Sequence, residues 1–181
     1  MMNGIQSKTF GTIAIGSGAI AASIYLVMIN VTLAHVHAVS GHVPFDMRPI
    51  GYGPADAVTL LDALGVEGRH YYLTRQLALD TLYPATLALT LVATICWFAQ
   101  RFSHSILARA AIAVSVGSAL FDYIENLGIA VMLWVGPDVS ATLINATSVA
   151  TIVKSALTTL AVLLVIVVGL VWARQTKPVM P

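Results

Sequence analysis

The chain has 181 residues, of which 58% are hydrophobic and only 9% are charged. A soluble domain usually has about 25% charged residues, so this composition is typical of a protein whose surface faces lipid rather than water. Nine basic side chains nearly balance eight acidic ones, which argues against nucleic acid as a partner.

Four apolar segments are long enough to cross a bilayer, at about 12–36, 78–100, 107–134 and 145–173. The first is longer than the apolar core of a secretory signal, ~7–15 residues, so we interpret it as a retained anchor. Backbone groups in lipid must bond within their own segment, and we therefore expect each span to be helical. The sequence predicts an all-α protein with a single transmembrane domain, 1–181, that forms an integral membrane four-helix bundle.

The first connector, about 38–77, is the only long one. Its first part, 41–54, contains three prolines and three glycines and is predicted to be irregular. Pro54 can then occupy the first turn of a short amphipathic helix, in which Val58, Leu61 and Leu64 share one face and which ends at Gly65. We expect this helix to lie flat on the bundle or the membrane interface, and the connector to serve as a lid.

Basic residues are unevenly distributed between the two sides of a four-pass chain. One side receives Lys8, Arg101, Arg109, Arg174 and Lys177, and the other receives Arg48, Arg69 and Arg75. The positive-inside rule then predicts a multi-pass protein of the cell (inner) membrane, with both termini in the cytoplasm and the first and third connectors outside.

Four ionisable residues lie within the predicted spans: Asp80, Asp122, Glu125 and Lys154. Each costs at least ~2.5 kcal/mol to insert, so such residues usually face the bundle interior and are functional candidates. Counting about 1.5 Å per residue from the cytoplasmic boundaries places all four in one layer, in the outer half of the bundle. The same count brings the segment from Asn30 to His35 to this level.

Polar residues at helical spacing accompany these charges on three spans. They are Tyr72, Gln76, Asp80 and Tyr83; Ser115, Ser118, Asp122, Glu125 and Asn126; and Thr147, Thr151, Lys154, Ser155 and Thr158. Stripes of this kind meet inside a bundle, which predicts a polar cavity open to the outer side and roofed by the first connector. Lys154 should pair with Asp122 or Glu125, and this leaves carboxylates in excess that can hold a proton, donate one or bind a cation. A purely structural ion-pair network is the alternative.

Candidate roles follow from this arrangement. We assign acid–base catalysis to Asp122, Glu125 and Lys154; the predicted ligand-binding residues are Asp80, Gln76, Tyr83, Asn126, Thr151, Asn30 and His35. His35 and His37 are two residues apart and point to different sides of a helix, a poor spacing for one metal ion. With His42, Asp46 and His70 they could form an outward metal or haem site, but interfacial histidines at a helix end are the preferred interpretation. We predict no metal and no other cofactor.

The order of elements resembles that of the EXPERA-domain family, which includes emopamil-binding sterol isomerases and sigma-type receptors. The resemblance rests on a first span, a connector with a flat helix, and a second span with an acid and a proline in Asp80-Thr-Leu-Tyr-Pro84. It implies four or five helices, an acidic cavity that opens to the bilayer, and a lipid-like ligand. The isomerases have a histidine four residues before a glutamate on the second span; Gln76 and Asp80 stand at those positions here, so isomerase activity is not implied.

The sequence thus favours a small membrane protein that binds a hydrophobic or amphiphilic ligand and can transform it by acid–base chemistry; whether it is an enzyme stays open. Its expected partners are the lipid bilayer and a hydrophobic small molecule. Two alternatives remain: a proton- or cation-coupled transporter, usually a homodimer, and a structural or assembly subunit of a larger membrane complex. In a structural or assembly subunit, the small residues Gly117, Ala119, Gly128 and Ala130 would pack against a partner.

Overall fold

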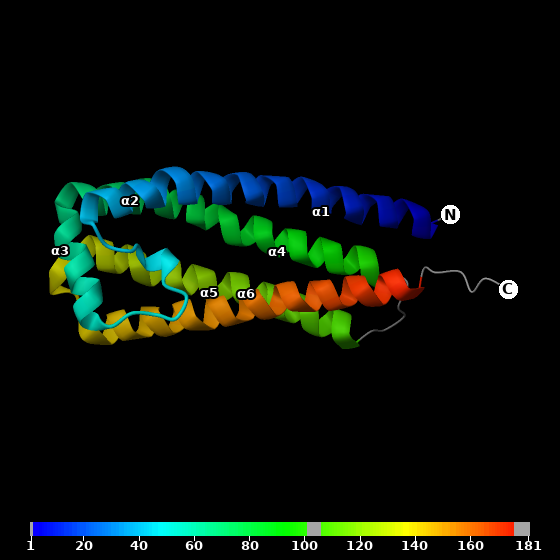
Figure 1. Ribbon diagram of the computed structural model, residues 1–181. Helices are drawn as coiled ribbons and strands as arrows, with labels where there is room; N and C mark the ends of the chain where they lie inside the picture. Colours follow the sequence, from blue (N-terminus) through cyan, green and yellow to red (C-terminus); the bar gives the residue numbers. More distant parts are fainter. Residues whose placement is uncertain (1, 101–105, 176–181) are drawn as a thin grey trace.

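The computed structural model describes the backbone of residues 2–100 and 106–175 (Figure 1). Helices account for 92% of the structure, and the described residues contain no strand, which confirms the all-α prediction. The elements in chain order are α1 (Met2–Val27), η1 (Met28–Thr32), α2 (Leu33–Ser40), η2 (Phe45–Met47), α3 (Pro54–Tyr71), η3 (Tyr72–Gln76), α4 (Leu77–Ala99), α5 (Ile106–Val135), η4 (Gly136–Asp138) and α6 (Ala141–Gln175).

Four continuous helical stretches are long and apolar enough to cross a membrane: Lys8–Ser40, Pro54–Ala99, Ile106–Asp138 and Ala141–Arg174. In the bundle α1 packs along α4, α4 along α5, and α5 along α6. The start of α1 and the end of α6 lie at one end of the molecule, here called the terminal end, and α3 crosses the other, the α3 end (Figure 1). Arg101 and Lys177, on which the predicted charge bias partly depends, lie outside the described residues.

The short helix predicted in the first connector is α3. Pro54 occupies its first turn, where the missing N–H costs nothing, and the N–H of Gly53 donates to Asp56 Oδ2 at 3.3 Å. Leu61 and Leu64 on its inner face are buried. The backbone leaves helical geometry at Gly65, with φ +59°, so the chain turns there toward α4.

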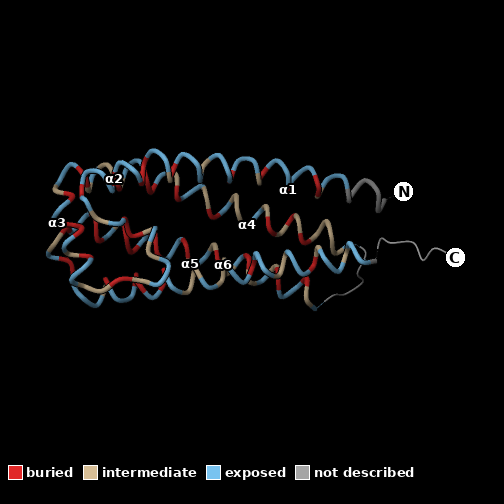
Figure 2. The backbone as a smooth tube through the Cα atoms, in the orientation of Figure 1, coloured by how far each residue is buried: buried red, intermediate tan, exposed pale blue. Residues whose placement is uncertain are grey.

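Buried positions are denser at the α3 end of the molecule than along the rest of the spans (Figure 2). The larger apolar core lies there, where α3 and the connector cover the bundle, and includes Phe45, Leu60, Tyr72 and Ile129. A smaller cluster around Ile95 packs toward the terminal end. Most other apolar side chains on the spans face outward, as expected where the solvent is lipid.

Two π-helical turns lie opposite one another near this core. They are η1, between α1 and α2, and η3, between α3 and α4, and the Thr32 hydroxyl of one donates to Gln76 Oε1 of the other. A π-turn inserts one extra residue into a helix and is often found at functional sites. Here the pair fixes where the first and second spans meet.

Candidate ligand-binding site

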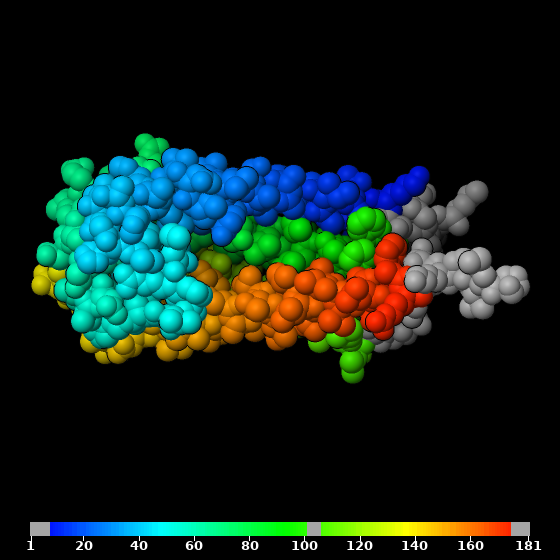
Figure 3. All heavy atoms as spheres, viewed as in Figure 1, coloured from blue at the N-terminus to red at the C-terminus, as the bar shows by residue number. Residues whose placement is uncertain are grey.

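A cavity of about 380 Å³ lies among α1, α4, α5, α6 and the connector. Its apolar lining includes Met28, Ile29, Leu33 and Leu87, and its charged lining consists of Asp46, Asp80, Asp122 and Lys154. The space-filling view shows the surface hollowed between α1 and α6, with α4 at the floor and the connector at one end (Figure 3). The opening is therefore on the side of the bundle, where lipid chains would lie.

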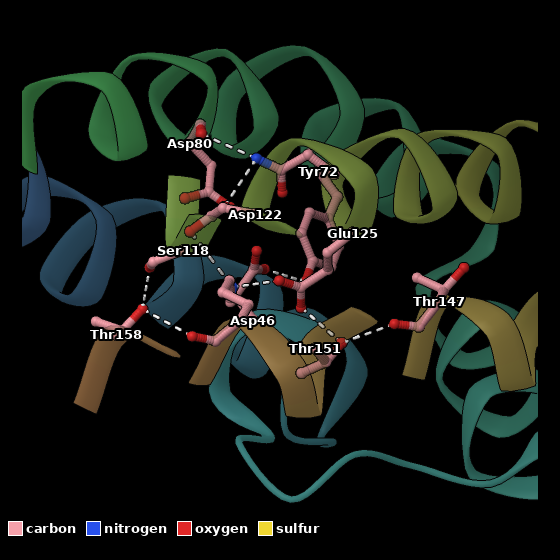
Figure 4. Close-up of polar contacts among 11 residues, drawn as sticks. Asp46, Tyr72, Asp80, Ser118, Asp122, Glu125, Thr147, Thr151 and Thr158 are labelled. Carbon is pink, nitrogen blue, oxygen red and sulfur yellow. Dashed lines mark hydrogen bonds and ion pairs between the residues drawn. The ribbon is translucent and has the colours of Figure 1, made fainter. Parts of the chain in front are cut away.

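One cation at the cavity wall forms ion pairs with two carboxylates. The Lys154 ammonium forms an ion pair with Glu125 Oε2 and lies 3.8 Å from Asp122 Oδ2. Thr151, one turn before Lys154 on α6, donates to the other Glu125 oxygen at 2.8 Å. Glu125 is completely buried. The pairing predicted for Lys154 is confirmed with both acids, and the converging side chains are drawn in Figure 4.

The position of Asp80 depends on a proline one turn further along α4. Pro84 has no N–H, so it cannot bond the carbonyl of Asp80 four residues earlier. The side-chain amide of Asn126 on α5 donates to this carbonyl at 2.9 Å instead, and to Asp122 Oδ1 at 3.3 Å. Asn126 thereby ties α4 to α5 and holds Asp80 and Asp122 on neighbouring positions of the cavity wall.

The connector supplies a carboxylate that the sequence analysis did not place in the site. Asp46, in η2, accepts a hydrogen bond from the buried Tyr72 hydroxyl and lines the cavity. Phe45 beside it is fully buried and anchors η2 in the core. The available signal was an acid between two apolar residues in a proline-bounded segment, Pro44-Phe45-Asp46-Met47. Counting along helices could not reveal it, because Asp46 belongs to no span.

Carboxyl groups are in excess around the cavity. Lys154 forms ion pairs with Asp122 and Glu125, but no described basic residue pairs with Asp46 or Asp80. Asp46 Oδ1 and Asp80 Oδ2 are both buried without a hydrogen-bond partner among the described residues. Of the charged groups around Asp80, Asp46 acts on it most strongly. Buried polar atoms normally have a partner, and the Asp46 and Asp80 carboxyls lie within hydrogen-bonding reach of one another, so either a proton shared between them or a donor on a ligand would satisfy these oxygens.

Five of the seven predicted ligand-binding residues lie at or behind this wall. Tyr83 lines the cavity with Asp80 and stacks on Tyr25 with ring centroids 5.8 Å apart. Gln76, Asn126 and Thr151 are buried behind it, held by the hydrogen bonds to Thr32, Asp80 and Glu125. They position neighbouring groups rather than line the cavity.

Asn30 and His35 do not join this group, which corrects their expected placement. Asn30 is exposed, and its amide donates to the Leu26 carbonyl of its own helix at 2.8 Å. His35 is also exposed and lies against Tyr71, with ring centroids 4.1 Å apart. Neither residue lines the cavity. No cluster of three potential metal ligands occurs in the described part of the chain.

Aromatic residues close the α3 end above the site. Phe45 packs on Tyr52 with ring centroids 4.8 Å apart, and the Tyr52 amide donates to Ser148 Oγ on α6 at 2.8 Å. Burial, together with the negative charge of Glu125, raises the pKa of the Tyr52 phenol above its ordinary value. Gly51, with φ +84°, lies so close to α6 that an added Cβ would be 2.6 Å from Ser148 Oγ. The connector is thus docked on α6.

The fold and site together define a small four-span membrane protein with an acidic cavity that opens on the side of its bundle. No protein family, no curated protein and no solved structure matches the chain. The resemblance to the EXPERA-domain family therefore stays a prediction from the order of elements.

Proposed function

We propose that this protein binds an amphiphile that enters sideways from the bilayer, with its polar head in the acidic cavity. The observation that carries the proposal is the pair of buried, unpartnered oxygens on Asp46 and Asp80. A head group that donates hydrogen bonds, above all a protonated amine, would satisfy both oxygens and offset their charge. A carboxylate or phosphate head would meet like charge instead.

The shape of the cavity supports an apolar body on this ligand. The first span contributes Met28, Ile29 and Leu33 to the lining, which offer no polar side-chain group, together with Tyr25. The aromatic residues Phe45, Tyr52 and Tyr72 occupy the α3 end, while the hollow between α1 and α6 faces sideways (Figure 3). We place the α3 end on the outer side of the cell membrane, so that the ligand would come from the outer leaflet.

Acid–base chemistry on the bound ligand would depend on the groups that line the cavity. Asp80 and Asp122 lie at its surface and can exchange a proton with a head group. Glu125 is completely buried behind Lys154, so its role would be to hold the ammonium in place rather than to touch the ligand. The catalytic assignment of Asp122, Glu125 and Lys154 thus becomes a proposal with two different roles for the two acids.

Support for the complex-subunit alternative is weaker in this geometry. Gly128 faces Thr147 of α6 so closely that a Cβ would be 2.2 Å from Thr147 Oγ1, and Gly117 lies near Leu157. Both glycines serve the packing of α5 against α6 within the chain. Gly128 is buried by this contact, whereas Gly117 is half-buried.

The proposal is tested by comparing head groups on one hydrocarbon chain. The protein in nanodiscs is titrated with a straight-chain alkylamine and with the alkanoate of equal length, and thermal unfolding is followed, because a ligand that binds only the folded state raises the midpoint. We expect the amine alone to stabilise, and Asp80→Asn to abolish the effect. Asp138→Asn, an exposed carboxyl outside the cavity lining, is the matched control. Equal stabilisation by both head groups would contradict the proposal.

A further inference from the structure

A second hollow, of about 520 Å³, lies on the lipid-facing side of α6 next to the cavity. The connector overhangs it through Pro49 and Ile50, and the side chain of Ile50 is 90% exposed. Along α6 it follows one stripe at helical spacing: Ile152, Ser155, Ala156, Thr159, Leu160 and Leu163. We call this hollow the α6 groove. The small residues in the middle of the stripe leave room beneath the overhang.

The α6 groove and the acidic cavity are continuous, because Ser155 and Thr159 line both. On one side of these two residues, Lys154 and Thr158 of α6 line the cavity. On the other side, Ala156 and Leu160 line the groove. Successive residues of an α-helix are about 100° apart, so the two hollows face directions that differ by roughly that angle around α6. A molecule that fills both must bend around the helix.

The overhang is a fixed part of the structure rather than a loose loop. Arg48 donates from Nε and Nη2 to the Val43 carbonyl at 2.9 and 2.8 Å, which braces the connector internally. On the other side of Ile50, the Gly51 amide donates a hydrogen bond to the Arg48 carbonyl at 2.8 Å. The Tyr52 amide donates one to Ser148 Oγ. The groove is shallow and open, but it is therefore present before any ligand binds.

We infer that the ligand is a flexible single-chain amphiphile whose hydrocarbon tail leaves the acidic cavity over Ser155 and Thr159 and lies in the α6 groove beneath Ile50. The inference rests on the proposed function, since it takes the polar head to occupy the cavity. It adds the shape of the ligand: a straight chain can turn by about 100° around a helix, whereas a rigid fused-ring skeleton cannot follow that path.

The position of the tail is the informative measurement, rather than affinity. Transfer of a chain from bilayer lipid to a protein groove exchanges one hydrocarbon environment for another, so chain length alone gives little net driving force. Two photoreactive alkylamines are therefore used in nanodiscs, one with a diazirine beside the amine and one with a diazirine in the distal chain. Labelled peptides are identified by mass spectrometry, with and without excess unlabelled alkylamine.

We expect the head-proximal probe to label cavity residues, and the distal probe to label the α6 segment 156–163 and the connector at Ile50. Excess alkylamine should suppress both. Ala156→Trp should abolish distal labelling of the groove while head-proximal labelling persists. Ala146→Trp, at an exposed position about 15 Å along α6 from Ala156 and about 80° around it, should change neither.

Three outcomes would overturn the inference. Distal labels on α1 and α4 instead of α6 would show that the tail leaves by another route. Distal labelling spread over all lipid-facing helices and insensitive to competitor would show an ordinary boundary lipid only. Normal groove labelling in Ala156→Trp would show that the groove is not the binding surface. If the head-proximal probe labels nothing that excess alkylamine suppresses, the proposed function itself fails, and the two failures are thereby distinguished.

Discussion

The side-chain amide of Asn126 donates a hydrogen bond to the main-chain carbonyl of Asp80, 2.9 Å away, in the place of the N–H that Pro84 lacks. A proline in one span is thereby coupled to an asparagine in another. Within lipid no water can satisfy an open carbonyl, so a neighbouring helix must do so. The bond also fixes the level at which Asp80 and Asp122 meet.

This relationship predicts a conditional loss of stability. Asn126→Leu should lower the free energy of unfolding by about 1 kcal/mol, because it leaves the Asp80 carbonyl without a donor. In a Pro84→Ala background, the restored N–H at position 84 can donate to that carbonyl. Asn126→Leu should then lower the free energy of unfolding by less than it does in the wild-type background. A double-mutant cycle measured by detergent-induced unfolding checks this. The same loss in both backgrounds would contradict the coupling.

The ion pairs of Lys154 predict a larger effect with a specific rescue. Lys154→Met should destabilise the protein by about 3–5 kcal/mol, because Glu125 and Asp122 remain as buried charges without a cation. Adding Glu125→Gln to this variant removes one of the two charges and should recover much of the loss. The unfolding free energies of the single and double variants provide the measurement. If Glu125→Gln lowers the unfolding free energy of the Lys154→Met variant further, Lys154 does not offset the charge of Glu125 as described.

Close packing of the connector predicts different responses at two glycines. Gly51→Ala places a methyl group 2.6 Å from Ser148 Oγ and should lift the connector from α6, so that the Tyr52 amide exchanges hydrogen faster. Gly41 also has positive φ, +68°, but a Cβ there meets no atom within 4 Å. Gly41→Ala therefore controls for backbone strain alone and should leave exchange at Tyr52 unchanged. Equal acceleration in both variants would rule out the contact as the cause.

The raised pKa of Tyr52 predicts a loss of stability at alkaline pH. The folded state keeps this phenol neutral, whereas in the unfolded chain it ionises near its ordinary pKa of about 10. Its contribution to stability is thus fully present below about pH 10 and is lost as the pH rises toward the folded-state pKa. Tyr52→Phe should flatten the pH dependence of the unfolding free energy above pH ~10. An unchanged alkaline slope would show that Tyr52 is not responsible for it.

The sequence predicted the acidic wall of the site well, because it rests on helical periodicity and on the high cost of charge in lipid. Asp122, Glu125 and Lys154 meet as spacing and depth counting suggested. Asp46 was missed because the path of an irregular connector is set by distant contacts, here those of Phe45 and Tyr72.

The errors at Asn30 and His35 have a different origin. Counting along a span gives the depth of a residue but not the direction in which it faces. The π-turn η1, Met28–Thr32, also inserts an extra residue, which shifts the phase of every later side chain on this span. No pattern in the sequence indicated this π-turn. The Asn126–Asp80 bond was likewise hidden, although Pro84 signalled that some donor would be needed.

Native mass spectrometry of gently extracted protein tests the central claim most directly, with wild type compared with an Asp46→Asn/Asp80→Asn double variant. Wild type should retain a bound single-chain amphiphile with a hydrogen-bond-donating head, and the double variant should lose it while staying folded. Wild type that carries no such molecule, or a double variant that retains it equally, would contradict the account.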